Sequence, residues 1–366
     1  MQADIPVAAR ESAAPRAAEP AARSAAPDLP LPGTGSALLP ESLAWRSPRM
    51  VLGLAILIAL LCVPMVSTWL EQGFYLSFAT RIVIYAVAAS ALNLVLGYGG
   101  MVSLGHSLFL GVGAYVVGIC SFHGLTNGWA HLFITLAVTG VVALATGLVS
   151  LRTRGIGFIM ITLAFGQMFY FLAVSLKQYG GDDGLPVEAR SDFSPLPSLD
   201  DKVSLYYFAL ALLAVVMYAV WRIVHGRFGY VLRGFQANER RMLAAGFPRL
   251  RYQLTAYVGS AMACGVAGIL LGNLTSFASP SYLSWQMSGD LLLIVVLGGM
   301  GTVMGPLVGA IALLILEESL SGLTQHWMAI LGPIILLVAL FASRGIWGGM
   351  AHFLNNRKSA GGEENP

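Results

Sequence analysis

The sequence predicts an all-α integral membrane protein, a polytopic helical bundle of about ten transmembrane helices with eight as the lower bound. Of its 366 residues, 57% are hydrophobic and 11% are charged, whereas a soluble domain carries about 25% charged residues. The 42 glycines suit helices that approach one another closely in lipid. The apolar runs are continuous and lack an alternation of period two, which disfavours a β-barrel.

The two ends of the chain differ from the rest. Residues 1–48 are rich in Ala and Pro and carry charges of both signs, so we predict a disordered cytoplasmic tail. Acids such as Asp4 and Glu11 argue against a transit peptide, and the first apolar run starts too late for a signal peptide. Residues 346–366 are predicted to be a cytoplasmic C-terminal tail, which leaves 49–345 as the transmembrane domain.

Between the tails, most apolar stretches have the roughly 20 residues that a spanning helix needs. The eighth to tenth are shorter or interrupted by glycine. The predicted stretches are 50–70, 77–97, 102–122, 130–150, 156–176, 203–222, 252–273, 286–301, 303–320 and 327–343.

Lys and Arg in the loops predict the orientation, because cytoplasmic loops carry an excess of them. Residues 222–251 hold seven arginines, and a turn holds Arg152 and Arg154. Both segments are predicted to be cytoplasmic. Residues 177–202 carry more acids than bases and are predicted to be periplasmic. Ten spans with both termini in the cytoplasm satisfy these assignments.

The first segment of interest, 97–115, opens with a dense run of glycines. Each glycine weakens a helix by about 1 kcal/mol, and helices broken at mid-membrane expose backbone groups to substrates in transporters. Ser103 and His106 add polar groups there, and for His106 we favour packing against a neighbouring helix over substrate contact. The predicted break or packing glycines are Gly97, Gly99, Gly100 and Gly105.

The second segment, 298–309, loosely echoes the first, since Gly-Gly-Met opens both. Interruptions in two halves of a chain indicate an internal repeat with the pathway between them. Gly301, Gly305 and Gly309 are four apart and are predicted to line one helix face. Pro306 favours a kink or a helix start. The predicted break or packing glycines here are Gly298, Gly299, Gly301, Gly305 and Gly309.

The third segment lies in the 222–251 loop, where residues 236–245 favour a helix and Gly246 is placed to cap its end. A short cytoplasmic helix suits the docking of a partner. A solvated amphipathic loop helix with no partner is the alternative that composition alone leaves equally open.

A few ionisable or reactive residues lie inside the apolar runs. Asp290 is the best candidate among the charged ones for a path role, although for Asp290 we favour solvation at the interface over that role. Arg81 is expected to snorkel to the interface, and Glu317 and Glu318 are expected to reach water. The three cysteines are expected to be small buried apolar side chains. These are Cys62, Cys120 and Cys264.

Several motifs are absent from the sequence. It contains no G-x-x-x-x-G-K-[ST] run, so it has no P-loop for ATP. It has no His, Cys or Asp cluster with metal spacing and no set typical of a hydrolase, so we predict no metal, no cofactor and no enzymatic activity. Active transport would therefore need energy from another chain.

Four separated motifs, in order between about 77 and 343, resemble the branched-chain amino-acid permeases of binding-protein-dependent ABC importers. Length and the Asp-Asp loop resemble the longer of the two permease subunits of such importers. The motifs are ALNLVLGYGGMVSLGHSLFLGVGAY at 91–115, LRTRGIGFIMITLAFGQ at 151–167, GGDDG at 180–184 and VLGGMGTVMGP at 296–306.

The resemblance implies a shorter sister permease, two cytoplasmic ATPase subunits that would use the ATP, and a periplasmic binding protein. It implies that the cytoplasmic loop is an ATPase-coupling helix, although Leu243 stands where relatives often carry Glu. The implied coupling residues are Arg233, Asn238, Glu239, Ala244, Ala245 and Gly246. The candidate substrate-path residues are Asn93, Ser103, His106, Gln167, Asp290 and Thr302.

The predicted function is therefore import of branched-chain or related amino acids across the bacterial inner membrane by alternating access. Permeases for urea, amides or aromatic acids share the scaffold, and the fold does not fix the ligand. An ion-coupled secondary transporter is a rival that needs buried carboxylates, for which Asp290 is the candidate. An intramembrane enzyme is a further rival that needs a clustered catalytic set.

Overall fold

The computed structural model describes residues 48–69, 73–194, 199, 201–324, 326–341 and 345–349. The predicted tails, 1–48 and 346–366, lie almost wholly outside these residues. The described elements are α1 (Pro48–Trp69), α2 (Gly73–Asn93), the π-helix η1 (Leu94–Tyr98), α3 (His106–Phe122), α4 (Gly128–Ser150), α5 (Ile156–Ser175), η2 (Lys177–Tyr179), β1 (Leu185–Pro186), α6 (Lys202–His225), α7 (Arg227–Ala237), α8 (Glu239–Ala244), α9 (Arg249–Thr275), β2 (Phe277–Ala278), η3 (Pro280–Leu283), α10 (Trp285–Gly298), α11 (Gly305–Leu323) and α12 (Trp327–Phe341).

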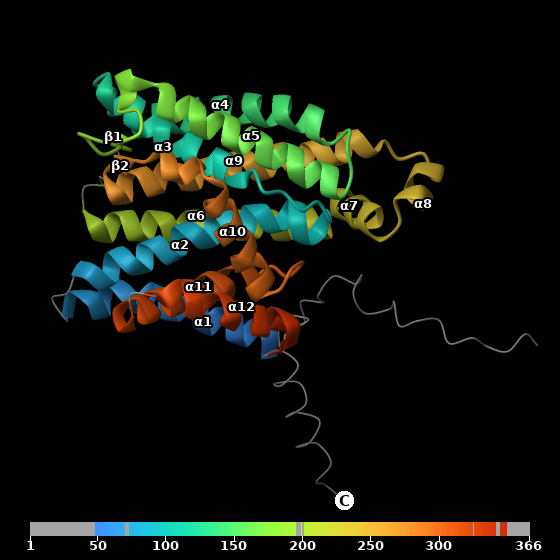
Figure 1. The fold of residues 1–366 in the computed structure, drawn as a ribbon. Helices are drawn as coiled ribbons and strands as arrows, with labels where there is room; N and C mark the ends of the chain where they lie inside the picture. The colour runs from blue at the N-terminus through green and yellow to red at the C-terminus, as the bar shows by residue number, and fades with distance from the viewer. Residues whose placement is uncertain are drawn as a thin grey trace, which may run out of the picture. The chain divides into compact units, whose positions relative to one another are not determined.

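Each predicted apolar stretch contains a helix, and most of the long helices run in layers with roughly aligned axes, with α10 inclined to them (Figure 1). Within the described residues, six helices are long and apolar enough to cross a membrane, namely α2 with η1, α4, α5, α6, α9 and α11. Four shorter apolar segments lie in α1, α3, α10 and α12. The two main differences from prediction are that α3 begins at His106 and α10 ends at Gly298, because both helices stop at glycine-rich loops.

α2 is the central helix. Of its most apolar stretch, 94% is buried, compared with 22% for α5. Small side chains such as Ala86, Ala88 and Ala89 are fully buried and let α6, α9 and α11 pack against it. The peripheral α4 and α5 expose large apolar side chains, including Phe133 and Phe171, which suits a lipid or a protein neighbour rather than water.

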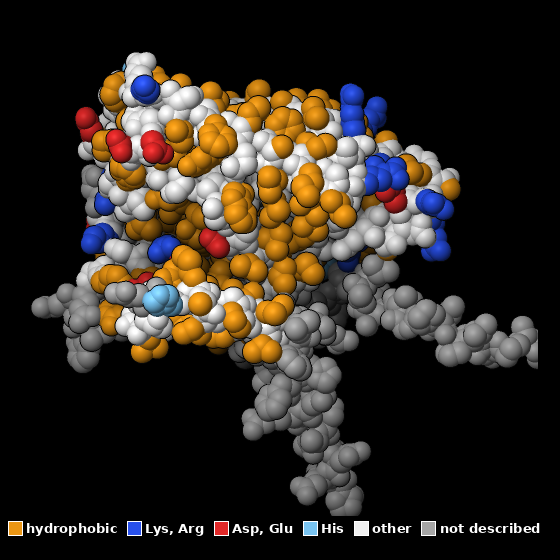
Figure 2. All heavy atoms as spheres, in the orientation of Figure 1, with side chains coloured by type: hydrophobic (Ala, Val, Ile, Leu, Met, Phe, Trp, Pro, Cys, Tyr) orange, Lys and Arg blue, Asp and Glu red, His pale blue; other side chains and the backbone are white. Residues whose placement is uncertain are grey.

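Apolar side chains cover the belt between the ends of the helices, and charged side chains gather at both ends (Figure 2). An acidic side chain also lies inside this belt. The α7–α8 hairpin lies at the end opposite β1 and β2 (Figure 1). The fold thus has two polar ends and an apolar middle.

α1 is tied to the bundle at its internal proline. Pro64 has no N–H, so it cannot donate to the carbonyl four residues earlier. The buried Tyr206 hydroxyl on α6 donates to that carbonyl, of Leu60, at 2.5 Å. Of the cysteines, Cys120 and Cys264 are buried as predicted, but Cys62 is exposed on α1, so the prediction for Cys62 is wrong.

α3 and α9 cross at very short range. A Cβ at Gly113 would overlap the Gly265 carbonyl, and a Cβ at Gly268 would overlap the Leu110 carbonyl. Only glycine allows the two backbones to touch in this way. This crossing fixes the position of α3 along α9, and with it the position of His106, the first residue of α3.

Residues 177–194 pack on one end of the bundle. β1 pairs antiparallel with β2, with Leu185 opposite Ala278. The buried His131 contacts the Ser191 hydroxyl at 2.7 Å and the Leu125 carbonyl at 2.8 Å. Asn273 donates to the same hydroxyl at 3.0 Å. This polar cluster anchors the segment to α4 and α9.

Candidate functional site

The two glycine-rich segments meet. Asn93, at the end of α2 and 1% exposed, donates to the Thr302 carbonyl at 2.8 Å. Its side-chain oxygen accepts from the backbone N–H of Gly301 at 3.0 Å. We call residues 97–105 break 1 and residues 299–304 break 2. One amide therefore satisfies a donor and an acceptor of break 2 from beside break 1.

The glycines are required by this contact. A Cβ at Gly97 would overlap the Asn93 side-chain oxygen and the Gly301 nitrogen. Gly100, Gly299 and Gly301 have φ of 66°, 116° and 74°, a region that L-residues with a Cβ seldom adopt. Glycine therefore provides both the close approach and the turn geometry at these breaks.

The remaining predicted packing glycines hold α10 against α11. A Cβ at Gly298 would overlap the Gly305 carbonyl, and one at Gly309 would overlap the Ile294 carbonyl. Gly301 lies in the loop before α11, so it does not share the helix face of Gly305 and Gly309 as the four-residue spacing predicted. Gly99 and Gly105 similarly lie against backbone, at the Val95 and Thr162 carbonyls.

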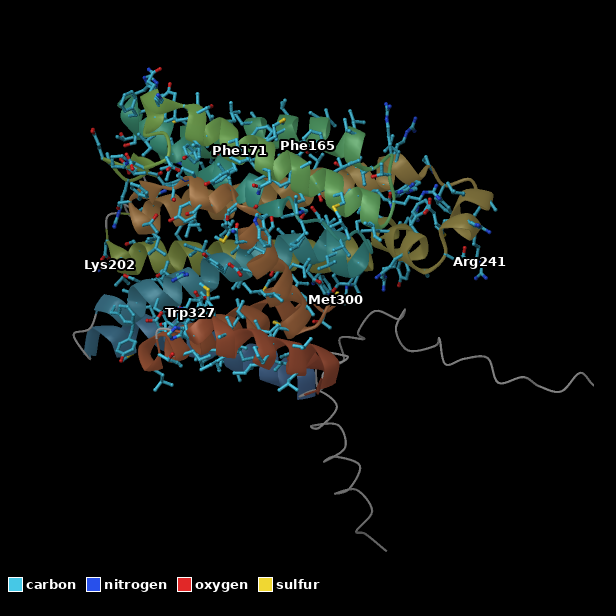
Figure 3. All side chains as sticks on the ribbon, in the orientation of Figure 1. Phe165, Phe171, Lys202, Arg241, Met300 and Trp327 are labelled. Atoms are coloured by element: carbon cyan, nitrogen blue, oxygen red, sulfur yellow. The ribbon has the colours of Figure 1, made fainter. Side chains whose placement is uncertain are left out.

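Thr302 closes break 2. Its hydroxyl donates to the Gly299 carbonyl at 2.9 Å and accepts from the Gly305 N–H at 3.1 Å. Met300 is exposed and lies in this loop, toward the end of the bundle that carries α8 and Arg241 (Figure 3). Break 2 is thus an ordered turn between two helices.

His106 has partners on both ring nitrogens. Nδ1 contacts the Ser103 hydroxyl at 3.0 Å, and Nε2 contacts the Ser260 hydroxyl at 3.1 Å. Ser260 donates its single hydrogen to the Ala91 carbonyl, so Nε2 must donate and Nδ1 must accept. Ser103 and His106 are both 0% exposed. This is a satisfied neutral histidine, which favours the packing interpretation over substrate contact.

Gln167 and Thr162 lie on α5 beside break 1. Thr162 accepts from the Leu104 N–H at 3.2 Å, a contact that the sequence did not suggest. The side-chain nitrogen of Gln167 is buried and has no hydrogen-bond partner in the structure. Buried amides are nearly always paired, so Gln167 is the candidate path residue with an unused donor.

Charged residues from three helices lie near one another inside the apolar belt. Arg81 on α2 is 4.0 Å from Glu317 on α11, and their side chains are 42% and 33% exposed. Asp290 on α10 is exposed and lies within electrostatic reach of both. Arg81 also lies over the ring of Tyr85 at 5.5 Å. The sequence analysis assigned these residues to different locations and did not predict that they lie near one another.

The loop helix predicted at 236–245 is two helices, α7 and α8, joined at Asn238. The Asn238 side chain caps α8 by accepting from the Arg241 N–H at 3.0 Å. Gly246 follows α8 with φ of 86°, as expected for a capping glycine. The helix breaks at Asn238 because its side chain competes for the backbone donors that start α8.

Glu239 fixes the hairpin to the rest of that end. It lies 2.9 Å from Arg154 in the α4–α5 turn and 3.3 Å from Arg249 at the start of α9. Arg233 is 8% exposed and donates to the Val224 carbonyl at 3.0 Å. Arg233 therefore joins α6 to α7.

The outer surface of the hairpin is exposed and partly apolar. Leu243 is 44% exposed and Phe247 36%. Arg240, Arg241, Ala244 and Ala245 are exposed beside them. An apolar surface among arginines at a water-facing end is typical of a protein interaction site.

Gln236 on α7 reaches break 1 and was not singled out by sequence reasoning. Its side-chain nitrogen donates to the Gly97 carbonyl at 3.2 Å, and its Cγ would lie 2.8 Å from a Cβ on Gly100. Nothing in the sequence distinguishes Gln236 from any exposed polar residue of an amphipathic helix.

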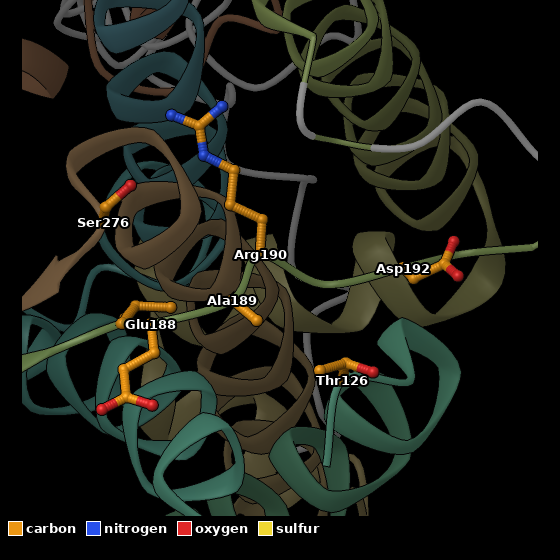
Figure 4. A pocket seen from close by; sticks show the side chains of 7 residues that line it. Thr126, Glu188, Ala189, Arg190, Asp192 and Ser276 are labelled. Carbon is orange, nitrogen blue, oxygen red and sulfur yellow. The ribbon is translucent and has the colours of Figure 1, made fainter. Parts of the chain in front are cut away.

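A cavity of about 610 Å³ lies at the opposite end of the bundle. Its lining residues are Thr126, Val187, Glu188, Ala189, Arg190, Asp192 and Ser276. Figure 4 shows the charged side chains of Glu188, Arg190 and Asp192 pointing in different directions. The cavity contains none of the candidate path residues. Among the described residues, no group of three or more His, Cys, Asp or Glu side chains could hold a metal.

The apolar belt, the broken central helices and the polar ends define a multi-pass membrane protein with the build of a permease. Residues 74–340 match the family described as "Branched-chain amino acid transport system / permease component". The chain belongs to this family. A comparison with solved structures finds no match.

Individual relatives agree with the family. The chain is 26% identical to the high-affinity branched-chain amino acid transport system permease protein LivM of Salmonella typhimurium, over 79% of this chain and 74% of that protein. It is 26% identical to LivH of Escherichia coli, over 72% of this chain and 91% of LivH. It is 28% identical to the autoinducer 2 import system permease protein LsrC of Enterobacter, over 73% and 79%.

Proposed function

We propose that this chain is a permease subunit of an ATP-driven, binding-protein-dependent importer, and that it moves branched-chain or related amino acids by alternating access. The α7–α8 hairpin is the observation that carries the ATP-driven part. It exposes Leu243 and Phe247 at a water-facing end while Glu239 ties it to two other segments. The sequence holds no P-loop, so the energy would come from a partner that docks there.

The proposed topology has ten crossings, made by the six long helices and the four shorter apolar ones. The hairpin carries the arginine excess, so its end is cytoplasmic by the positive-inside rule. The end with β1 and β2 is then periplasmic, and the membrane is the bacterial inner membrane. Both predicted tails, 1–48 and 346–366, would be cytoplasmic.

The proposed path runs beside the breaks rather than through the His106 cluster. Ser103 and His106 are sealed in and satisfied, whereas Gln167 keeps a free donor and Thr302 is partly exposed. The group of Arg81, Asp290 and Glu317 marks the outer part of the path, because exposed charges inside an apolar belt are costly against lipid.

The proposed partners are a sister permease, two ATPases and a substrate-binding protein. The match to both LivM and LivH supports a pair of related permeases. The protein itself would need no cofactor, and no catalytic residue is assigned. Motion would follow from ATP binding on the cytoplasmic side, since only differential binding energy can bias a conformation.

The substrate is the least constrained part of the proposal. The names of the relatives include both branched-chain amino acids and autoinducer 2, so the scaffold carries more than one cargo. Urea, amides and aromatic acids are the alternatives within this class. A secondary transporter coupled to ions is the alternative outside it. The exposed Asp290 and the half-buried Glu317 are what favour it.

Affinity purification of the chain from its native membrane in mild detergent, followed by mass spectrometry, tests this assignment. We expect a second permease of the same family and P-loop ATPases in stoichiometric amounts. A chain that purifies alone and transports alone would contradict the proposal and favour the secondary transporter.

A further inference from the structure

A chain of contacts leads from the water-facing hairpin to both glycine breaks. Gln236 on α7 donates to the Gly97 carbonyl in break 1 at 3.2 Å and packs against Gly100. Four residues before Gly97, Asn93 holds the Gly301 N–H at 3.0 Å and the Thr302 carbonyl at 2.8 Å. Gly97 itself lies against the Gly301 backbone. These hydrogen bonds join residues that are 139 and 208 positions apart in the sequence. They connect the hairpin, break 1 and break 2.

The backbone departs from a regular α-helix at these points. Residues 94–98 form a π-helix, a rare form that often occurs at functional sites. Residues 99–105 are not helical. Gly100 and Met101 still donate to carbonyls of η1, whereas Leu104 and Gly105 donate to the hydroxyls of Thr162 and Ser103. Helix termini joined by a few side-chain contacts can shift while their helices stay intact.

Further contacts hold both ends of this series of contacts, at the hairpin and at break 2. Glu239 holds the far side of the hairpin to Arg154 and Arg249, and Arg233 joins α7 to the end of α6. On the other side, Gly299 packs against Gly345 and Thr302 closes its loop on Gly305. A displacement of α7 therefore reaches break 2 by way of Gln236, Gly97 and Asn93.

We propose that Gln236 and Asn93 are positioning residues that link the hairpin to both breaks, so that the position of α7 sets the geometry of residues 299–304. The inference rests on the proposed function in one respect only, namely that the link passes the motion of a docked ATPase to the path. The link itself is a property of this chain. Neither residue contacts substrate in this scheme.

Hydrogen exchange on the full chain in lipid nanodiscs tests the link without any partner. Gln236→Met removes the donor and keeps the length of the side chain. We expect exchange to rise about fivefold, the equivalent of one hydrogen bond, in peptides covering 97–101 and also in those covering 299–304, which Gln236 does not touch. Gln178→Met makes the same change at an exposed site on the opposite end and should alter neither segment.

Substitutions at Asn93 test the second contact in the series, between Asn93 and break 2. Asn93→Asp keeps the acceptor for Gly301 and removes the donor to Thr302, so it serves where Asn93→Ala fails to fold. In the Asn93→Ala background, adding Gln236→Met should raise exchange at 97–101 but add nothing at 299–304, because both contacts of the link are gone. In the Asn93→Asp background it should add less at 299–304 than it does in the wild-type chain, because only the Gly301 contact remains. Unchanged exchange at 299–304 in Gln236→Met alone would overturn the proposal.

Transport measurements then test whether the link couples ATP hydrolysis to uptake. In the assembled complex, Gln236→Met should lower uptake per ATP hydrolysed several-fold and leave ATP hydrolysis and assembly intact. Wild-type uptake per ATP in this variant would overturn the coupling role. If the wild-type chain assembles with no ATPase, the proposed function fails, and the exchange data still decide whether the link exists.

Discussion

The side-chain oxygen of Asn93 accepts the backbone hydrogen of Gly301 at 3.0 Å, across 208 residues of sequence. This contact joins the end of the central helix α2 to the turn between α10 and α11. The other half of the same amide holds the Thr302 carbonyl. The two glycine-rich segments that resemble each other in sequence therefore form one structural unit.

Asn93→Ala should destabilise the protein, because it leaves a backbone donor and acceptor of the turn unpaired. Each buried unpaired group costs about 1 to 3 kcal/mol. Because both contacts are part-buried, we expect a loss in the lower part of the combined range, about 2 to 4 kcal/mol in the free energy of unfolding. Thermal unfolding in detergent measures the change. Ser175→Ala, which removes an exposed hydroxyl bond to Leu172, is the control and should leave the midpoint nearly unchanged.

Gly268→Ala should prevent α3 and α9 from closing, because the new Cβ would overlap the Leu110 carbonyl. We expect a marked loss of folded protein by size-exclusion chromatography. Gly259→Ala is the matched control on the same helix, where a Cβ meets nothing within 4 Å. That control should be neutral or stabilising by up to about 1 kcal/mol. Equal behaviour of the two variants would refute the close crossing.

His106→Ala should lower stability and leave the apparent KM for substrate unchanged in the protein that folds. The ring is buried and both nitrogens have hydroxyl partners, so its loss leaves Ser103 and Ser260 unpaired and a cavity behind. Thermal unfolding and uptake at several substrate concentrations separate the two effects. A raised KM with normal stability would instead place His106 on the path.

Glu239→Gln should loosen the hairpin without unfolding the bundle. The carboxylate is the shared partner of Arg154 and Arg249, but such partly exposed pairs contribute at most about 1 kcal/mol each. We expect uptake per ATP to fall and the unfolding midpoint to change little. Glu188→Gln, an exposed carboxylate at the other end, is the control. Unaltered coupling in Glu239→Gln would remove its assigned role.

Asp290→Asn should reduce the uptake rate if the charged group near Arg81 and Glu317 lines the path. The substitution keeps the size of the side chain and removes one negative charge from an exposed position in the apolar belt. Uptake into liposomes measures the rate, with Asp183→Asn, at an exposed position in the segment before β1, as the control. Normal uptake would assign Asp290 to an interfacial role instead.

The sequence predicted the helix positions well because a run of about 20 apolar residues has few other solutions. It also predicted that the glycine-rich segments interrupt helices and that Gly246 ends the loop helix. These are local properties, readable from composition and spacing. The predicted helices wrongly included residues 102–105, 299–301 and 303–304, because the breaks are longer than the hydropathy suggested. α2 and α9 also begin four and three residues earlier than predicted, and the predicted loop helix is divided at Asn238.

The tertiary relationships were beyond the sequence. The partners of Asn93 and of Gln236 are 208 and 139 residues away, and no pattern in a single chain pairs them. Arg233 was grouped with the docking residues because its charge lies in a basic loop, whereas its guanidinium is used internally at the Val224 carbonyl. The type of a residue indicates which groups its side chain can bind, but it does not indicate which backbone groups lie beside that side chain in the fold.

Uptake by liposomes that contain the co-purified complex tests directly whether this chain is the permease of an ATP-driven importer. With radiolabelled leucine, isoleucine or valine as cargo, we expect uptake that requires ATP on the side of the α7–α8 hairpin and stops when the ATPase subunits are omitted. Uptake that continues without those subunits, driven by an ion gradient alone, would contradict it.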